Sequence, residues 1–156
     1  MGRRSAVNRW LFVCLVLVGC QTARAPATSG TFAVGQVVAS TSESGLEDAL
    51  RTGIASALTN RSALGDAGAA SVDIAVLAAV TQATNTSEAG QSFAARLQIS
   101  VRSGGRTGQF SSERNYTVID AVQGEVARKA AFDALAQTLT RDAVDWLLAP
   151  KKPSNG

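Results

Sequence analysis

The 156-residue chain contains no histidine and two cysteines, and 5% of its residues are aromatic. Without histidine it cannot form a Ser-His-Asp or Cys-His triad, a histidine metal site or an imidazole pH switch. Two cysteines allow at most one disulfide and are too few for a thiolate zinc cluster. These absences exclude the enzymes and zinc proteins that depend on such side chains, and the length predicts one small domain.

The chain also lacks a long apolar run. Its apolar run Trp10–Val18 has nine residues, whereas a helix needs about 20 to cross a membrane. Arg3, Arg4 and Arg9 precede this run, and a glycine follows it. A positive flank, a short apolar stretch and a small residue are typical of an export signal. We therefore interpret residues 1–19 as a signal peptide.

A cysteine follows this segment directly. The stretch Leu17-Val18-Gly19-Cys20 resembles the lipobox of bacterial lipoproteins, in which the cysteine becomes the first mature residue and carries the lipid. The resemblance implies lipidation of Cys20, including palmitate, and several acyl chains anchor stably where one would not. The next residue is Gln21 rather than the Asp that often signals inner-membrane retention, which favours the outer membrane. The alternative is an ordinary secretory signal with an incidental cysteine.

The mature chain divides into three parts. Residues 20–30 contain the cysteine and a small, polar, proline-containing stretch that is typical of a flexible tether. Residues 31–149 are long enough for one modest core. Residues 150–156 are predicted to be a disordered tail.

Apolar periodicity predicts the elements of the body. In chain order they are a strand over 31–40, a helix over 45–63, strands over 71–82, 92–102 and 107–119, and a helix over 120–148, with a polar loop over 83–91. The order β-α-β-β-β-α predicts an α+β fold, in which two helices pack on one face of a four-stranded mixed sheet.

Local motifs refine the helix boundaries and one turn. Ser44 with Glu47, and Asp120 with Gln123, both match the capping box that starts a helix. Gly65 follows the first helix as its expected stop. Gly104-Gly105 predicts a tight hairpin turn, because glycine adopts positive φ at little cost.

Alternation assigns the strand faces. In the second strand Val72, Ile74, Val76, Ala78 and Val80 should share one face. The next strand alternates cleanly, which predicts one wet face. The last strand is more polar and is expected at an edge. Near the end of the last helix, Trp146 is interpreted as a core residue, with a docking patch at Leu147-Leu148 as the alternative.

The residues suggest no catalytic site. The acidic side chains are scattered, the serines have no histidine partner, and Lys129 is the only lysine of the body. We therefore expect no enzymatic activity, no catalytic residues, no metal and no cofactor.

Four arginines near the Gly-Gly turn form the tentative ligand site. Arg96 and Arg102 share the wet strand face, and Arg106 and Arg114 lie in or after the turn. Guanidinium groups pair with phosphates in two-pronged fashion, so the cluster with Tyr116 could bind an anionic glycolipid or glycan. The alternative is a strand face whose arginines only keep it soluble.

The basic pI of about 9.3 does not indicate nucleic-acid binding. Three of the 15 basic residues leave with the signal peptide, so the mature chain has 12 basic and 12 acidic residues. The body keeps 9 basic residues against all 12 acids. No basic surface for nucleic acid is expected.

The lipobox, the hairpin at Gly104-Gly105, and the strand Arg114–Thr117 that runs into an Ala-rich helix resemble the lipopolysaccharide-assembly lipoprotein family. That resemblance implies a non-enzymatic accessory that sits in an outer-membrane β-barrel, faces the periplasm, and helps deliver lipopolysaccharide to the outer leaflet. Similar bodies occur in Tol-type periplasmic domains and in activators of peptidoglycan synthases. The alternative function is a periplasmic module that binds lipopolysaccharide or peptidoglycan.

Overall fold

The computed structural model describes residues 31–66, 68–87 and 90–150. Its elements are β1 (Phe32–Val38), α1 (Leu46–Asn60), β2 (Ala70–Ser87), β3 (Gly90–Ser103), β4 (Arg106–Val118) and α2 (Ala121–Leu148). The signal peptide, Cys20, the tether and all of the tail except Pro150 lie outside the described residues and stay predictions.

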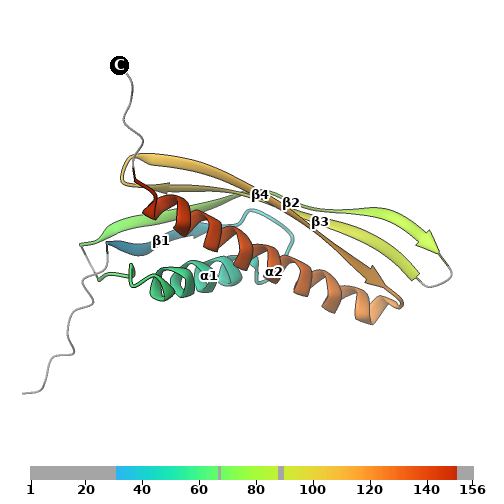
Figure 1. Ribbon diagram of the computed structural model, residues 1–156. Coiled ribbons are helices and arrows are strands. Elements are labelled where there is room, and N and C mark those ends of the chain that lie inside the picture. Colours follow the sequence, from blue (N-terminus) through green and yellow to red (C-terminus); the bar gives the residue numbers. More distant parts are fainter. Residues whose placement is uncertain (1–30, 67, 88–89, 151–156) are drawn as a thin grey trace, which may run out of the picture.

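The four strands form one mixed sheet in the order β1-β2-β3-β4. β1 is parallel to β2, and the other neighbours are antiparallel. Both helices lie on the same side of the sheet, which we call its inner face, and no helix of the described residues lies on the outer face (Figure 1). The predicted α+β fold, its element order and the edge position of the last strand are confirmed.

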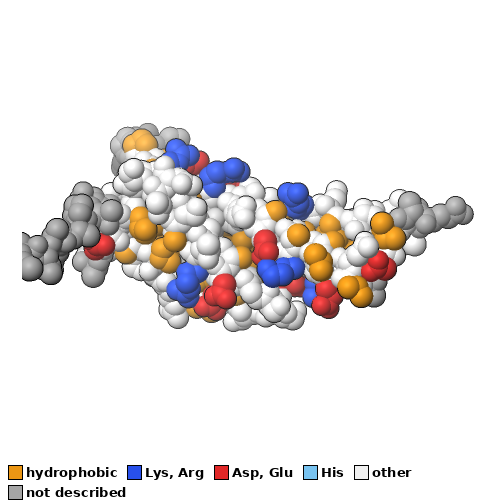
Figure 2. Space-filling model, turned by 90° about the horizontal axis from the view of Figure 1, so that it is seen from below, with side chains coloured by type: hydrophobic (Ala, Val, Ile, Leu, Met, Phe, Trp, Pro, Cys, Tyr) orange, Lys and Arg blue, Asp and Glu red, His pale blue; other side chains and the backbone are white. Residues whose placement is uncertain are grey.

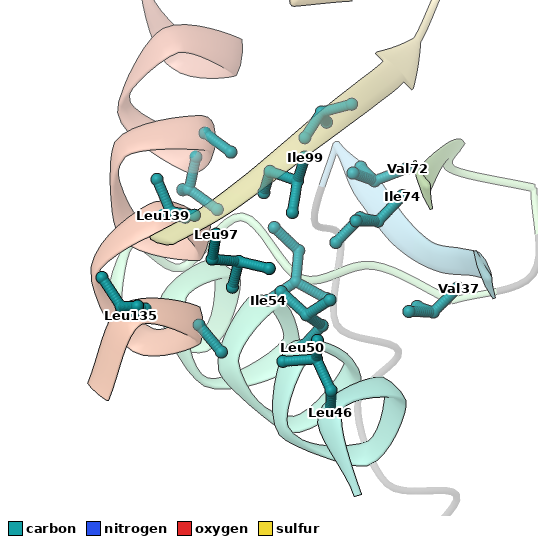
Figure 3. Packing of buried hydrophobic residues seen from close by; sticks show 14 of the residues in the cluster. Val37, Leu46, Leu50, Ile54, Val72, Ile74, Leu97, Ile99, Leu135 and Leu139 are labelled. Carbon is teal, nitrogen blue, oxygen red and sulfur yellow. The ribbon is translucent and has the colours of Figure 1, made fainter. Parts of the chain in front are cut away.

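The core lies between the inner face and the two helices. α1 buries a residue at every fourth position, from Leu46 through Leu50 and Ile54 to Leu58. These side chains meet the inner-face row of β3, which includes Leu97 and is fully buried (Figure 3). Burial of one such side chain contributes about 1.5–3 kcal/mol, so this contact dominates the packing energy of α1.

β2 contains an extra residue that the alternation did not predict. Val76 pairs with Ile99, but Ala78 pairs with Gln98, so Leu77 has no partner on β3. Such a β-bulge makes two residues of one strand oppose one residue of the other. The side chains that follow it therefore change face.

Two residues that were predicted to share a face with Val72 and Ile74 consequently lie on the outer face. Val80 pairs with the outer-face residue Arg96 and is 51% exposed. The prediction that Ala78 and Val80 continue the inner row of Val72 and Ile74 was wrong, because a strand period of two holds only until a bulge.

The predicted loop over 83–91 was also wrong. β2 continues to Ser87 and β3 begins at Gly90, so all but the tip of this segment pairs as strand. Thr84 and Thr86 are polar but β-branched, and such residues suit a pleated strand. The resulting β2–β3 hairpin projects beyond the start of α2 (Figure 1).

The helix boundaries follow the capping prediction at one helix only. Asp120 caps α2 and accepts a hydrogen bond from the backbone N–H of Gln123 at 2.8 Å. α1 instead starts after Gly45, which has φ 77° and no side-chain cap, so Ser44 lies one residue too early. Ser62, with φ 53°, follows the end of α1 in place of the expected Gly65.

The two helices run side by side but are of unequal length. Gly45, just before α1, lies near Lys129 of α2, and Arg61, just after α1, forms an ion pair with Asp145. α2 therefore extends about two turns beyond the start of α1, at eight residues and 3.6 residues per turn. No helix in the described part of the chain is long and apolar enough to cross a membrane.

Candidate interaction surfaces

The hairpin turn separates the four arginines of the predicted ligand site. Gly104 and Gly105 adopt φ 56° and 75°, as predicted, and form a two-residue turn that pairs Ser103 with Arg106. Ser103 belongs to the buried inner row of β3, so Arg106 lies on the inner face.

The remaining arginines divide in the same way. Arg114 pairs with the buried Ala95 and lies on the inner-face side of β4, whereas Arg96 and Arg102 lie on the outer face. The expectation of a single basic cluster was therefore wrong. The length of the Gly-Gly turn contained the necessary signal, because a two-residue turn fixes which residues of the two strands share a face.

Arg106 holds the end of α2 against the sheet. Its guanidinium lies 4.4 Å from the ring centre of Trp146. It also donates hydrogen bonds to the carbonyl oxygens of Trp146 at 3.1 Å, Leu147 at 3.3 Å and Ala149 at 3.4 Å. The last carbonyls of a helix lack partners within the helix, so a cation there is favourable. Arg106 thus has a structural role that the sequence did not reveal.

Trp146 packs against the core, as predicted. Its ring meets Phe110 of β4 edge-on, with 5.8 Å between the ring centres. Leu147 is buried, whereas Leu148 is partly exposed. Of the alternative docking patch at Leu147-Leu148, only Leu148 therefore lies at the surface.

The outer face carries charges of both signs. Arg96 donates to Glu113 on the neighbouring strand at 2.7 Å. Arg102 lies directly across from Asp73, which also accepts hydrogen bonds from the Gln36 N–H at 2.9 Å and from Ser71. The Gln36 and Ser71 hydrogen bonds, helped by the charge of Arg102, hold the pKa of Asp73 below its usual value against a small opposing effect of burial.

A groove of about 820 Å³ runs between α1 and α2 on their solvent side. Small α1 residues such as Gly53 and Ala57 line it, opposite Lys129 and Asp133 of α2. Those two side chains form an ion pair at 2.7 Å, so the amine is not an unpaired nucleophile. Among the described residues, no three His, Cys, Asp or Glu side chains gather as metal ligands.

The most unusual surface is the edge of β2. β1 pairs only with residues from Ala70 to Ala75 of β2, while β2 continues to Ser87. In the described part of the chain, residues 76–87 therefore have a strand on one side only. We call this segment the free edge. It contains no charged residue, and Leu77 and Val80 within it are 49% and 51% exposed.

A second apolar surface lies at the start of α2. Ile119, Val122 and Val126 are 74%, 81% and 68% exposed. They precede the part of α2 that lies beside α1, so α1 does not cover them. We call these three residues the apolar end. Figure 2 shows hydrophobic side chains at the surface of this part of the molecule, mixed with a few charged ones.

The sequence predictions missed the length of the free edge. With residues 83–91 read as a loop, the second strand was predicted to end at residue 82, only slightly longer than the first strand over 31–40. The signal that was available is the β-branched content of residues 80–86, which contain one valine and three threonines.

Comparison with known proteins supports the fold. The chain is similar to a candidate lipoprotein of Caulobacter crescentus, with 20% identity, a TM-score of 0.53, and coverage of 78% of this chain and 93% of that one. It also aligns with a minor lipoprotein of Acinetobacter baumannii, with 19% identity, a TM-score of 0.49 and coverage of 79% and 97%. Rare lipoprotein B of Shewanella oneidensis aligns with 11% identity, a TM-score of 0.39 and coverage of 74% and 98%.

No protein-family model matches the chain, and no curated protein matches it. At 20% identity, the likeness to the Caulobacter crescentus structure shows a shared fold alone.

Proposed function

We propose that this protein is an outer-membrane lipoprotein, anchored through Cys20, whose periplasmic body is a non-enzymatic accessory of an envelope machine. The lipobox Leu17–Cys20 supports the anchor. Solved structures that are similar to this chain include proteins described as lipoproteins, which supports a location in the cell envelope. The apolar end of α2 is the observation that carries the accessory role, because so exposed an apolar surface is typical of a docking site.

The position of the apolar end fits a protein partner rather than the anchoring membrane. The body begins next to the C-terminal end of α2, since Phe32 bridges to Leu64 and the neighbouring Arg61 pairs with Asp145. The apolar end lies at the opposite end of this 28-residue helix (Figure 1). At 1.5 Å per residue, the helix separates the two by about 40 Å.

The finer proposal is a role in lipopolysaccharide transport to the outer leaflet, with an outer-membrane β-barrel as partner. It rests on the family resemblance of the lipobox, the Gly104-Gly105 hairpin and the strand that leads into the Ala-rich final helix. Open strand edges add to this support, because strand addition is a common way to join β proteins.

The anchor is tested by Cys20→Ser. We expect this variant to leave the membrane fraction and to lose labelling by a clickable fatty acid. Cys14→Ser is the matched control, because Cys14 lies within the predicted signal peptide and should leave lipidation unchanged. Membrane retention of the Cys20→Ser chain would contradict the proposal.

Docking at the apolar end is tested by cross-linking in the envelope. Val122→Asp with Val126→Asp should abolish recovery of the envelope partner, because a charge would be buried at the interface. Gln109→Asp with Gln137→Asp adds the same charge at exposed polar positions of β4 and α2, away from the apolar end, and should leave recovery unchanged. Equal recovery from both pairs would overturn the docking role.

The alternative function, binding of lipopolysaccharide or peptidoglycan, now has fewer arginines to use. Arg106 is engaged with the end of α2 and Arg96 with Glu113, which leaves Arg102 on the outer face and Arg114 on the other side of the sheet. If Arg96→Ala with Arg102→Ala weakens binding of purified lipopolysaccharide and lowers its salt dependence, this alternative gains support. Unchanged binding would end it.

A further inference from the structure

The apolar end continues the row of α2 side chains that lies beside α1. In this row Lys129 lies near Gly45, just before α1 begins. Val126 is three positions before Lys129, and both residues line one hollow beside the start of α1. Val122 is one helical turn before Val126 and therefore shares its side of α2. The row on α2 is thus about two turns longer than the helix that covers it (Figure 1).

The hollow lies where the apolar end meets the start of α1 and has a volume of about 220 Å³. Its lining includes the core side chains Leu46 and Phe132, each 2% exposed, together with Val126 of the apolar end. Glu43 and Arg128, which form an ion pair at 3.4 Å, also line it. The hollow can therefore take one apolar side chain of a partner, and a side chain seated in such a pocket often anchors an interface.

The charges around the apolar end and the hollow are acidic in sum. The acidic side chains are those of Glu43, Asp120, Glu125 and Asp133, and the basic ones are those of Arg128 and Lys129. Both basic side chains already form ion pairs with acidic ones, Arg128 with Glu43 and Lys129 with Asp133. Four acids against two bases leave a local net charge of −2. A partner complements this surface when lysines or arginines flank its apolar residues.

We propose that the partner segment that docks on the apolar end is an amphipathic helix whose apolar side is flanked by lysines or arginines. This inference rests on the proposed docking role and adds the chemistry of the partner. The side chains of a helix form ridges that pack into the grooves of a second helix. A partner strand would instead need an open sheet edge, and the backbone of a helix is hydrogen-bonded within itself.

A second copy of this chain fits the apolar end less well, for two reasons. In a two-fold contact each copy presents the same patch to the other, so Asp120 and Glu125 would face like charges. The apolar end also has three exposed side chains, whereas a stable interface involves about 20–30 residues on each side. A short basic helix meets neither obstacle.

Two synthetic peptides test this chemistry on the chain from residue 20 onward with Cys20→Ser, which contains the whole described body. Both are helical designs of about 18 residues with leucines along one side. One peptide has lysines beside the leucines, and the other has glutamates. We expect fluorescence anisotropy to show that the lysine peptide binds at least about tenfold more tightly than the glutamate peptide. Equal binding of the two peptides, or no binding of the lysine peptide, would overturn the proposal.

Three variants show whether the lysine peptide binds at the apolar end, and circular dichroism checks that each is folded. Val122→Ser with Val126→Ser should abolish binding, because it removes exposed apolar side chains. Glu125→Lys should weaken binding of the lysine peptide and strengthen binding of the glutamate peptide. Asp142→Lys is the matched control, because it makes the same charge change at an exposed position near the other end of α2 and should leave binding nearly unchanged. Equal responses to Glu125→Lys and Asp142→Lys would assign the binding to net charge alone and overturn the proposal.

Failure of this proposal can be told apart from failure of the docking role. If Val122→Asp with Val126→Asp abolishes recovery of the envelope partner but neither peptide binds, the docking role stands and the basic helix is wrong. If the lysine peptide binds as expected but the same double variant recovers the envelope partner normally, the accessory role fails and the preference of this surface for a basic helix stands.

Discussion

The two halves of the sheet differ in how deeply their side chains are buried. In the covered half, β1 and α1 lie against the first part of β2, and side chains such as Leu50 and Ile54 have no exposed surface. In the open half, β2 continues over residues 76–87 without β1 and beyond α1, and Leu77 and Val80 are about half exposed. The covered half therefore supplies most of the stability of the fold, and the open half leaves apolar side chains and a strand edge at the surface.

The largest difference in the free energy of unfolding is expected when one aliphatic side chain is truncated in each half. Ile54→Ala in the covered half should lower the free energy of unfolding by about 2–5 kcal/mol, because it leaves a cavity in a closed core. Leu77→Ala in the open half should lower it by less than about 1 kcal/mol, since the side chain is already half in water. Urea unfolding of the chain with Cys20→Ser measures both. Equal losses would mean that the two halves are not distinct.

The packing of α1 on α2 gives the next effect. A Cβ built on Gly53 would lie 2.7 Å from the hydroxyl oxygen of Thr140, which is fully buried and bonded to the Ala136 carbonyl. Gly53→Ala should therefore destabilise by about 1–3 kcal/mol through overpacking, although alanine is the better helix former by about 1 kcal/mol.

A double variant sharpens this prediction. Gly53→Ala combined with Thr140→Ala should cost less than the sum of the two single changes, because the second change removes the obstructing hydroxyl and methyl groups. Thermal unfolding of the four chains gives the coupling. Strict additivity would show that the two positions do not touch.

The Gly-Gly hairpin allows the same comparison between the two faces. Arg106→Ala should cost about 1–2 kcal/mol, because it removes the stacking on Trp146 and the hydrogen bonds to the end of α2. Arg102→Ala, on the outer face, should change the free energy of unfolding by less than about 0.5 kcal/mol. Trp146 fluorescence during urea unfolding follows both variants. A similar small change for both would remove the structural role of Arg106.

The smallest effect is expected at the junction of β1 and β2. The hydrogen bonds that Asp73 accepts from Gln36 and Ser71 lower its folded-state pKa, so its carboxylate stabilises the fold above the pKa of the unfolded chain. This contribution is lost as the pH falls through the lowered, folded-state pKa. Asp73→Asn should cost at most about 1 kcal/mol at neutral pH.

Urea unfolding at a series of acidic pH values measures this dependence. The difference between the unsubstituted chain and Asp73→Asn should shrink as the pH falls through the acidic range. A difference that does not vary with pH would show that the charge of Asp73 is not involved.

The sequence predicted the structure correctly where a local pattern and the fold agree. The periodicity from Leu46 to Leu58 predicts the buried side of α1, and the alternation from Ala95 to Val101 predicts the buried row of β3, and both are found. The Asp120 cap and the Gly-Gly turn are equally local, and both were predicted correctly.

The predictions failed where pairing with another strand decides. The bulge at Leu77 depends on how β2 fits β3, and no residue type at that position indicates it. The continuation of β2 through Thr84 and Thr86 depends on the same pairing, which provides partners for backbone groups that would otherwise remain in a loop. The free edge follows from both features, and so it emerges only in the folded chain.

Hydrogen–deuterium exchange tests the central comparison most directly, because the exchange rate of an amide reports how often its hydrogen bond opens. We predict that peptides covering residues 76–87 of β2 exchange faster than peptides covering residues 70–75, which lie between β1 and β3. Equal exchange in the two parts of β2, or slower exchange over residues 76–87, would contradict the contrast between the covered half and the open half.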